Sequence, residues 1–341
     1  MSSLTTFVDC PNLQNRLTDV FCQPGGMEAL PLIGFLFSGE NNPGTLQMVN
    51  GSRIRTVDLV YTRRVLESEV DDYINYNTCT ASIVRGETSS TYTFDENQGI
   101  EIARKFDLID LARRCEQDET YFARLISELM DGAERKMETQ AAVSLVANVG
   151  GFATIDTDGV AGGVKTVTSK LSDGTIDYDA HQMIMQSARF NQFCSAPVIA
   201  GDYEVVNYYD AIKVGCCAQT GLDFSSVAQG IPTILPSYRI GSAFADTSKF
   251  LVMEAGAAIP IWYNQYAGDL SARLSSDTHQ FVTVVSRRGI PFDLSVIRDC
   301  DTVHVKLKLA WDIFYKPTDM YENSDILDGV TGILTFDIVN P

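Results

Sequence analysis

The sequence predicts an α+β fold, because one very long helix lies between two regions that read as strands. The stretch RLISELMDGAERKMETQAAVSLVANVGG, from Arg124 to Gly151, reads as one uninterrupted helix that ends at its two final glycines. Near the C-terminus, VHVKLKLAWDIFY places apolar residues at the odd positions 303–315, which predicts a long strand with one buried face. GVTGILTFDIVN adds a terminal strand.

The composition indicates a globular chain of one large or two ordinary domains. Its 341 residues are 45% hydrophobic and 21% charged. Acidic side chains outnumber basic ones by 44 to 26, giving a net charge of -18, which disfavours binding to free nucleic acid or anionic membranes. There is no apolar run of the length that a membrane span needs, and the N-terminus lacks the pattern of a secretory signal.

The cysteines predict reduced thiols in a cytosolic protein rather than disulfides or a zinc site. The eight are scattered and form no CxxC pair: 10, 22, 79, 115, 194, 216, 217 and 300. We expect all eight to have structural roles.

The N-terminal third predicts an arm followed by a β excursion. Residues 1–48 are rich in turn formers, interrupted by apolar clusters such as ALPLIGFLF, so this arm is expected to pack on something else. Residues 50–98 read as a hairpin, with Val57, Leu59 and Tyr61 alternating with polar residues. Arginines at 53, 55, 63 and 64 precede acidic residues at 67, 69, 71 and 72, which indicates either a solvated surface or salt bridges to a neighbouring subunit.

The long helix is predicted over residues 119–148, with Asp118 as its N-cap. Before it, Ile102, Phe106, Ile109 and Cys115 are spaced at partly helical intervals. The helix has about 30 residues, against about 11–12 in an average helix, and it carries no heptad repeat.

The apolar residues of this helix recur at every fourth position: Leu125, Leu129, Ala133, Met137, Ala141 and Leu145. Four residues rotate a helix by about 400°, so the row drifts around the axis by about 40° per step. A drifting row predicts that different elements cover successive parts of the helix, with a plain bundle helix as the alternative. Gly132 in the helix interior suggests a close approach by another chain segment.

The chain beyond Gly150 and Gly151 alternates between helical and strand patterns. DYDAHQMIMQSARFNQF predicts a second helix, and SAPVIAGDYEVVNYYDAI predicts a strand followed by a helical turn. Short strands separated by Gly and Pro turns follow.

Candidate catalytic, cofactor and metal sites are weak throughout, and we assign none. There is no GxSxG, GxxxxGK[ST], GxGxxG or HExxH motif. His181, His279 and His304 are far apart in sequence, and His304 is expected to be solvated or hydrogen-bonded. Tyr209 and Lys213 form a YxxxK pair, but the Gly-rich nucleotide turn that should accompany it is missing.

A calcium loop is also disfavoured at DTDG, residues 156–159. The fifth and twelfth positions of such a loop need oxygen ligands, and they are occupied by Val160 and Val167. We therefore expect an ordinary loop with turn residues, no cofactor, and a protein that is not an enzyme.

The order of the elements resembles the tailed-bacteriophage major capsid protein family, whose fold is shared by encapsulins. The resemblance rests on five segments: ARLISELMDGAERKMETQAAVSLVAN (123–148), HQMIMQSARFNQFCSAPVIAGDYEVVNYY (181–209), GIPTILPS (230–237), FLVMEAGAAIPIWY (250–263) and RRGIPFDLSVIRDCDTVHVKLKLAWDIFY (287–315). It covers most of residues 50–340. No scaffolding segment is evident at the N-terminus, and nothing in the sequence supports a lysine–asparagine crosslink.

The resemblance implies a division of the chain into five parts. These are an N-terminal arm (1–48), an extended β-hairpin loop (49–99), a peripheral domain (100–178) with the spine helix 119–148, an axial domain (179–285) and the return β-strands of the peripheral domain (286–341).

The function that the resemblance implies is self-assembly, as hexamers and pentamers, into an icosahedral shell around packaged double-stranded DNA. Portal, scaffold and other capsid proteins are the further partners expected, with no membrane and no sequence-specific DNA binding. The expected location is the virion, after assembly in the bacterial cytoplasm. An encapsulin-like compartment and an unrelated soluble α+β protein are the alternatives.

Overall fold

The computed structural model describes most of the chain from residue 99 onward and three shorter segments before it. The described ranges are 29–38, 56–62, 87–93, 99–107, 118–157, 163–219, 232–266, 275–276, 278–299, 301–316, 327 and 329–340. Most of the predicted arm, the charged blocks at 53–55 and 63–72, Ile109, and the cysteines at 10, 22, 79, 115 and 300 lie outside these ranges.

The first large sheet is antiparallel and is built around one long strand. Its strands are β3 (Ile100–Asp107), β8 (Ala258–Tyr263), β9 (His279–Val285), β10 (Pro291–Asp299) and β11 (Thr302–Tyr315). The order is β3-β11-β10-β9, and β8 pairs with the C-terminal part of β11. The odd residues of β11 from Val303 to Ile313 are all buried, which confirms the strand and the buried face predicted from its alternation.

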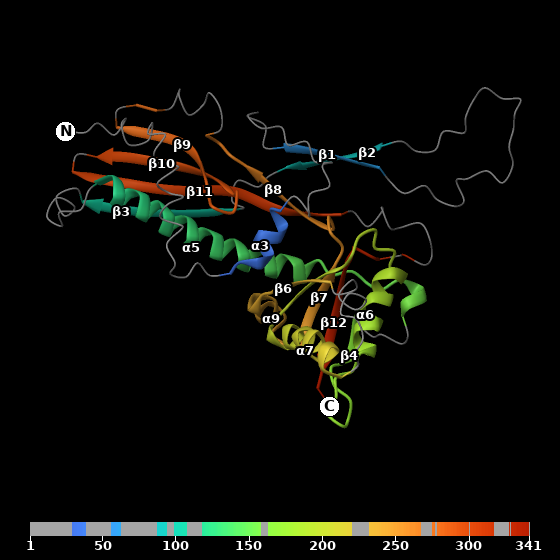
Figure 1. Ribbon diagram of the computed structural model, residues 1–341. Coiled ribbons are helices and arrows are strands. Elements are labelled where there is room, and N and C mark those ends of the chain that lie inside the picture. Colours follow the sequence, from blue (N-terminus) through green and yellow to red (C-terminus); the bar gives the residue numbers. More distant parts are fainter. Residues whose placement is uncertain are drawn as a thin grey trace, which may run out of the picture.

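The spine helix α5 (Asp118–Ala147) has 30 residues and confirms the predicted long helix to within one residue at each end. All six residues of the four-residue row are buried. The helix packs on β3 and β11, on the short helix α3 (Pro31–Leu36) and on α9 (Tyr238–Phe244). Figure 1 shows it lying along the first sheet and reaching the second part of the molecule. The prediction that several elements cover the drifting row is therefore confirmed.

Two local predictions near the spine are wrong. The helical spacing assigned from Ile100 onward belongs, over residues 100–107, to strand β3, which pairs antiparallel with β11. Ile102 and Phe106 are four residues apart, and that interval is also even, so it fits one face of a strand as well as one face of a helix. At Gly132 the expected close approach is not found among the described residues, where an added Cβ would meet only Ile102 Cδ1, at 3.7 Å.

The second large sheet is mixed, with the order β4-β12-β7-β5-β6. Its strands are β4 (Val164–Thr168), β5 (Val198–Gly201), β6 (Thr233–Pro236), β7 (Lys249–Met253) and β12 (Ile333–Val339). The terminal strand β12 pairs with β4 and β7. The predicted return of residues 286–341 is therefore shared between the two sheets: β10 and β11 join the first, and β12 joins the second.

Helices cover both faces of the second sheet. The helices α6 (Asp179–Phe190) and α7 (Tyr203–Gln219), with the 3-10 helix η2 (Thr154–Asp156), pack over Phe250, Phe336 and their neighbours on one face. The end of the spine and α9 cover Leu251, Met253 and Ile333 on the other. We call the second sheet with α6, α7, α9 and η2 the second body. Helix α6 and strand β5, which precedes α7, confirm the helix and the strand predicted from the sequence. Helix α7 is a full 17-residue helix, whereas the sequence predicted a single helical turn.

The remaining strands, β1 (Thr56–Thr62) and β2 (Glu87–Thr93), confirm the predicted β excursion. They pair antiparallel over their whole length, with Thr56 opposite Thr93. Among the described strands, this two-stranded ribbon pairs with no strand of either larger sheet.

Candidate functional site

The residue pairs that could have indicated an enzyme have structural partners instead. Tyr209 is buried in the core of the second body, and its hydroxyl lies 3.3 Å from Nδ1 of His181. Lys213 pairs with Asp210 at 3.4 Å. Burial raises the pKa of Tyr209 strongly, which is the opposite of what a Tyr–Lys proton donor requires.

The three histidines come from separate elements, α6, β9 and β11. Desolvation lowers the pKa of the half-buried His181. His279 and His304 both lie opposite Ile297 of β10, which stands between them in the sheet register. Two strand spacings, about 10 Å, therefore separate their backbones.

Asp156, the first residue of the DTDG stretch, is committed to a buried ion pair. Its Oδ1 lies 2.7 Å from Lys165 Nζ, and its Oδ2 accepts a hydrogen bond from Asn191 Nδ2 at 2.9 Å. Ser187 donates to the same carboxylate. The carboxylate thus joins η2, β4 and α6, while residues 158–162 lie outside the described ranges.

The part of the chain that the structure describes contains neither a candidate metal site nor a candidate membrane span. No cluster of three or more His, Cys, Asp or Glu side chains there could hold a metal ion. None of the helices described combines the length and apolar character that crossing a membrane requires.

The spine is where the parts of the molecule are brought together, and buried polar groups on it make the contacts. Glu138 is fully buried, and its carboxylate accepts the backbone N–H groups of Leu32 (3.1 Å) and Ile33 (2.8 Å) in the first turn of α3. Ser237, at the start of α9, donates to the same carboxylate at 3.4 Å. Desolvation raises the pKa of Glu138 despite these bonds.

One turn earlier on the spine, Glu134 forms an ion pair with Arg288, from the turn between β9 and β10. Desolvation raises the pKa of Glu134, and Asp131 nearby acts in the same direction. The spine is therefore held to three different elements through two neighbouring glutamates.

The C-terminal half of the spine is fixed to β11 by side-chain hydrogen bonds. Trp311 Nε1 donates to Gln140 Oε1 at 3.0 Å, and the Tyr315 hydroxyl donates to Ser144 Oγ at 2.6 Å. Burial raises the pKa of Tyr315 well above its ordinary value, so this hydroxyl remains a donor at any physiological pH.

The chain crosses between the two sheets at a hydrogen-bonded junction. The N–H of Gly150 donates to the carbonyl of Ile333, and that of Gly151 to the carbonyl of Gly329, both at 2.9 Å. Glu254, at the end of β7, pairs with Lys316 at the end of β11, at 3.2 Å. These contacts connect the segment after the spine to the start of β12, and the end of β7 to the end of β11.

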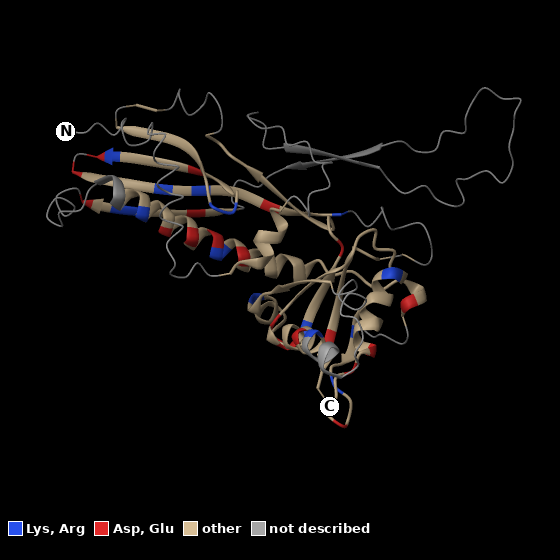
Figure 2. Cartoon of the chain, in the orientation of Figure 1, with Lys and Arg blue, Asp and Glu red and all other residues tan. Residues whose placement is uncertain are grey.

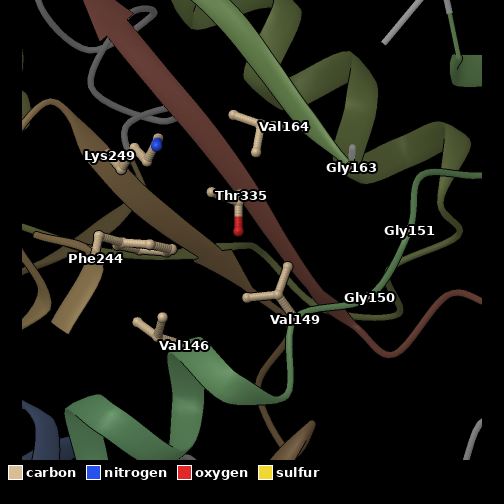
Figure 3. Close-up of a pocket in the computed structure, with 9 residues that line it drawn as sticks. All are labelled: Val146, Val149, Gly150, Gly151, Gly163, Val164, Phe244, Lys249 and Thr335. Carbon is tan, nitrogen blue, oxygen red and sulfur yellow. The ribbon is translucent and has the colours of Figure 1, made fainter. Parts of the chain in front are cut away.

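A shallow cleft of about 450 Å³ lies beside this junction. Figure 3 shows Val146 of the spine and Val149 just after it facing Thr335 of β12, with Phe244 and Lys249 on another side. Its walls are mainly apolar, with no cluster of titratable groups among its lining residues, so it offers packing surface rather than reactive chemistry.

Exposed apolar side chains concentrate on the second body. Among the described residues, the large apolar side chains exposed there are Ile155, Leu171, Tyr178, Met183, Phe190, Tyr203, Tyr238 and Val339, against Val143 and Val285 elsewhere. Figure 2 shows acidic and basic segments interspersed on α5 and the first sheet.

The described residues thus form a spine that carries an antiparallel sheet along its length and a mixed sheet at its end. Among solved structures, the chain is similar to the cyanophage A-1(L) capsid, with a TM-score of 0.50 and 11% identity over 94% of this chain and 98% of that chain. This likeness establishes the fold.

Two further solved structures align with the chain at lower scores. The mature capsid of bacteriophage PhiM1 aligns with a TM-score of 0.45 and 12% identity, over 94% of this chain and 91% of that one. The virus-like particle from Pyrococcus furiosus aligns with a TM-score of 0.38 and 11% identity, over 96% and 98%. No family model and no curated protein matches the sequence.

Sequence reasoning assigned no site residues, and it missed the buried polar contacts of the spine. Glu138 directly follows Met137 of the apolar row, and that position is the only sequence signal that its carboxylate might be buried. The partners Leu32 and Ser237 are about 100 residues away in either direction, so no local pattern could have connected them.

Proposed function

We propose that this chain is the major capsid protein of a tailed bacteriophage and assembles into an icosahedral shell around packaged double-stranded DNA. The observation that carries the proposal is the capsid-type fold, aligned over 94% of the chain with a phage capsid subunit. The role is structural, and we assign it no catalytic residue or cofactor.

The β1–β2 ribbon supports assembly. A two-stranded ribbon is at best marginally stable in water, and this one has no partner strand among the described residues of its own subunit. A neighbouring copy can supply the missing packing surface. Repeated contacts between different patches on identical chains build a closed shell when their rotations close.

The second body supports the same proposal through its exposed apolar side chains. Eight of the ten large apolar side chains that are exposed among the described residues belong to this body, including residues of helices that cover both faces of its sheet. We propose that this body packs against its copies around the centre of hexamers and pentamers.

If the chain forms a capsid shell, further binding partners are expected. Portal, scaffold and further capsid proteins would contact it, and DNA would lie inside without sequence-specific binding. A net charge of -18 fits a shell that must not hold its genome tightly during packaging. The mature location would be the virion, after assembly in the cytoplasm of the host bacterium.

The test is to express the full chain and examine it by size-exclusion chromatography and negative-stain electron microscopy. Closed shells of uniform diameter are expected. Shells that consistently enclose one protein cargo and exclude DNA would instead favour an encapsulin-like compartment. A stable species of one or two subunits under assembly conditions would contradict both kinds of shell.

A further inference from the structure

Helix α3 is a small element of the N-terminal arm that is docked on the spine. It has six residues, and Leu32, Ile33 and Leu36 are almost completely buried against α5 and its neighbours. Its N-cap residue, Leu30, makes no side-chain capping bond. The N–H groups at the start of a helix have no partner within the helix, so they need one from elsewhere.

Glu138 provides that partner from the spine. One carboxylate oxygen accepts Leu32 N–H at 3.1 Å and the other accepts Ile33 N–H at 2.8 Å. Both bonds are buried, and the side chain has no exposed surface. Without the carboxylate, two buried donors would lose their acceptor.

The same carboxylate also contacts the second body. Ser237, the N-cap residue of α9, donates to Glu138 Oε1 at 3.4 Å, and Arg239 Nε donates to Thr139 Oγ1 at 3.1 Å. Helix α9 in turn packs on β5 and β7. One side chain therefore meets the arm, the spine and the second body.

We propose that Glu138 is a latch: α3 leaves the spine as one unit before the rest of the subunit unfolds, and Glu138 couples this release to the first turn of α9. Helix α3 also packs on β6 and β8, but none of its contacts is a strand ladder, so α3 can separate without breaking either sheet. Coupling through one shared residue is reciprocal, so loosening α9 must also loosen α3.

The use of this latch in a shell rests on the proposed function, whereas the latch itself is a property of one subunit. In a shell, it would allow the arm and the second body to change position together. The test is therefore made on the unassembled full-length chain. The proposal that Glu138 is a latch can then be refuted without refuting the proposal that the chain assembles into a shell, and the second can be refuted without the first.

The experiment is amide hydrogen exchange, followed by mass spectrometry at neutral pH, on the wild type, Glu138→Ala and Ser237→Ala. In Glu138→Ala we expect the amides of residues 32–37 to exchange at least tenfold faster, which corresponds to about 1.4 kcal/mol. The amide of Ile240, in the first turn of α9, should also exchange faster, while those of β10 and β11 should keep their protection. Ser237→Ala should accelerate exchange in α3 to a smaller extent.

The matched control is Glu134→Gln, which alters the buried glutamate one turn earlier, where the partner is Arg288 rather than α3. This variant should leave the exchange of α3 unchanged. If Glu138→Ala does not fold, Glu138→Gln retains one acceptor oxygen and should give an intermediate acceleration in α3.

Three results would overturn the latch. The first is unchanged protection of residues 32–37 in the Glu138 variants. The second is an equal loss of protection in β10 and β11, which would mean that α3 does not open separately. The third is a loosened α3 with unchanged exchange at Ile240, which would refute the coupling to α9.

Discussion

At the scale of single residues, Gly132 in the interior of α5 and Gly150 just beyond its C-terminal end have opposite requirements. Of the atoms in the described residues, an added Cβ at Gly132 would meet only Ile102 Cδ1, at 3.7 Å, an ordinary van der Waals distance. At Gly150 it would lie 2.6 Å from the backbone N of Thr331 and 2.9 Å from the carbonyl oxygen of Gly329. The first glycine is therefore dispensable, whereas the second is required by the junction.

We expect Gly132→Ala to raise the free energy of unfolding by about 0.5–1 kcal/mol, because alanine loses less backbone entropy in a helix. Gly150→Ala should lower it by more than that, since the clash is with backbone atoms that also carry the junction's hydrogen bonds. Urea unfolding of the unassembled chain measures both. Destabilisation by Gly132→Ala would show that the glycine serves a contact not seen in this structure.

The buried carboxyl of Glu138 predicts a pH dependence of stability. Burial raises its pKa above the ordinary 4.5, against the hydrogen bonds from Ile33 and Leu32 and the charge of Arg239. The folded state then binds more protons than the unfolded state above pH 4.5, so this group's contribution to stability falls as pH rises through its folded pKa. Helix α3 contributes no titratable side chain, and Glu134 on the spine shifts in the same direction.

We expect Glu138→Gln to make the decrease of unfolding free energy between pH 4.5 and pH 7 shallower than in the wild type. The measurement is a series of urea unfolding curves at fixed ionic strength. An unchanged slope would mean that Glu138 titrates alike in the folded and unfolded states. None of this was predictable from sequence, because the burial of Glu138 depends on α3 and α9, which are distant in the chain.

At the scale of elements, the buried pair of Asp156 and Lys165 joins η2, β4 and α6. Removing one charge leaves the other buried without a partner, which typically lowers the free energy of unfolding by about 3–5 kcal/mol. Replacing both residues by apolar ones often leaves the stability nearly unchanged. We expect Lys165→Met to destabilise the chain by that amount and the double variant Asp156→Leu with Lys165→Met to recover most of the loss. Thermal and urea unfolding measure both. A double variant no more stable than the single one would contradict this account.

Some helices and strands could be predicted from the sequence pattern alone, and others could not. The alternation of β11 and the four-residue row of α5 are long enough to define one period, so both were predictable. Strand β3 was not, because Ile102 and Phe106 fit either period and the choice is made by pairing with β11, about 200 residues later. The strands that pair with β12 could not be predicted for the same reason. An alternating pattern indicates that a segment is a strand, but it does not indicate which other strand it pairs with.

At the scale of the whole molecule, the β1–β2 ribbon should matter for assembly and not for folding. Thr56 and Thr93 are paired, so residues 57–92 can be replaced by a short Gly-Ser turn without stretching the chain. We expect this variant to keep the melting temperature of the unassembled subunit within a few degrees but to form no closed shells. Calorimetry and negative-stain microscopy test the two parts. Normal shells from the shortened chain would show that the ribbon is not an assembly element.

The order of elements carried more information about function than any motif did. An arm, a β excursion, one long helix and closing strands predicted the fold that the structure has, whereas the motif searches assigned no site. The division of the chain into five parts remains a prediction, as do the DNA cargo and the other capsid partners.

The most direct measurement is electron microscopy of the purified full-length chain under assembly conditions, with size-exclusion chromatography of the same sample. The account expects closed icosahedral shells of one or a few discrete diameters, eluting far ahead of the 37.5 kDa subunit. A homogeneous species of one or two subunits that never forms shells, despite a folded spine and both sheets, would contradict it.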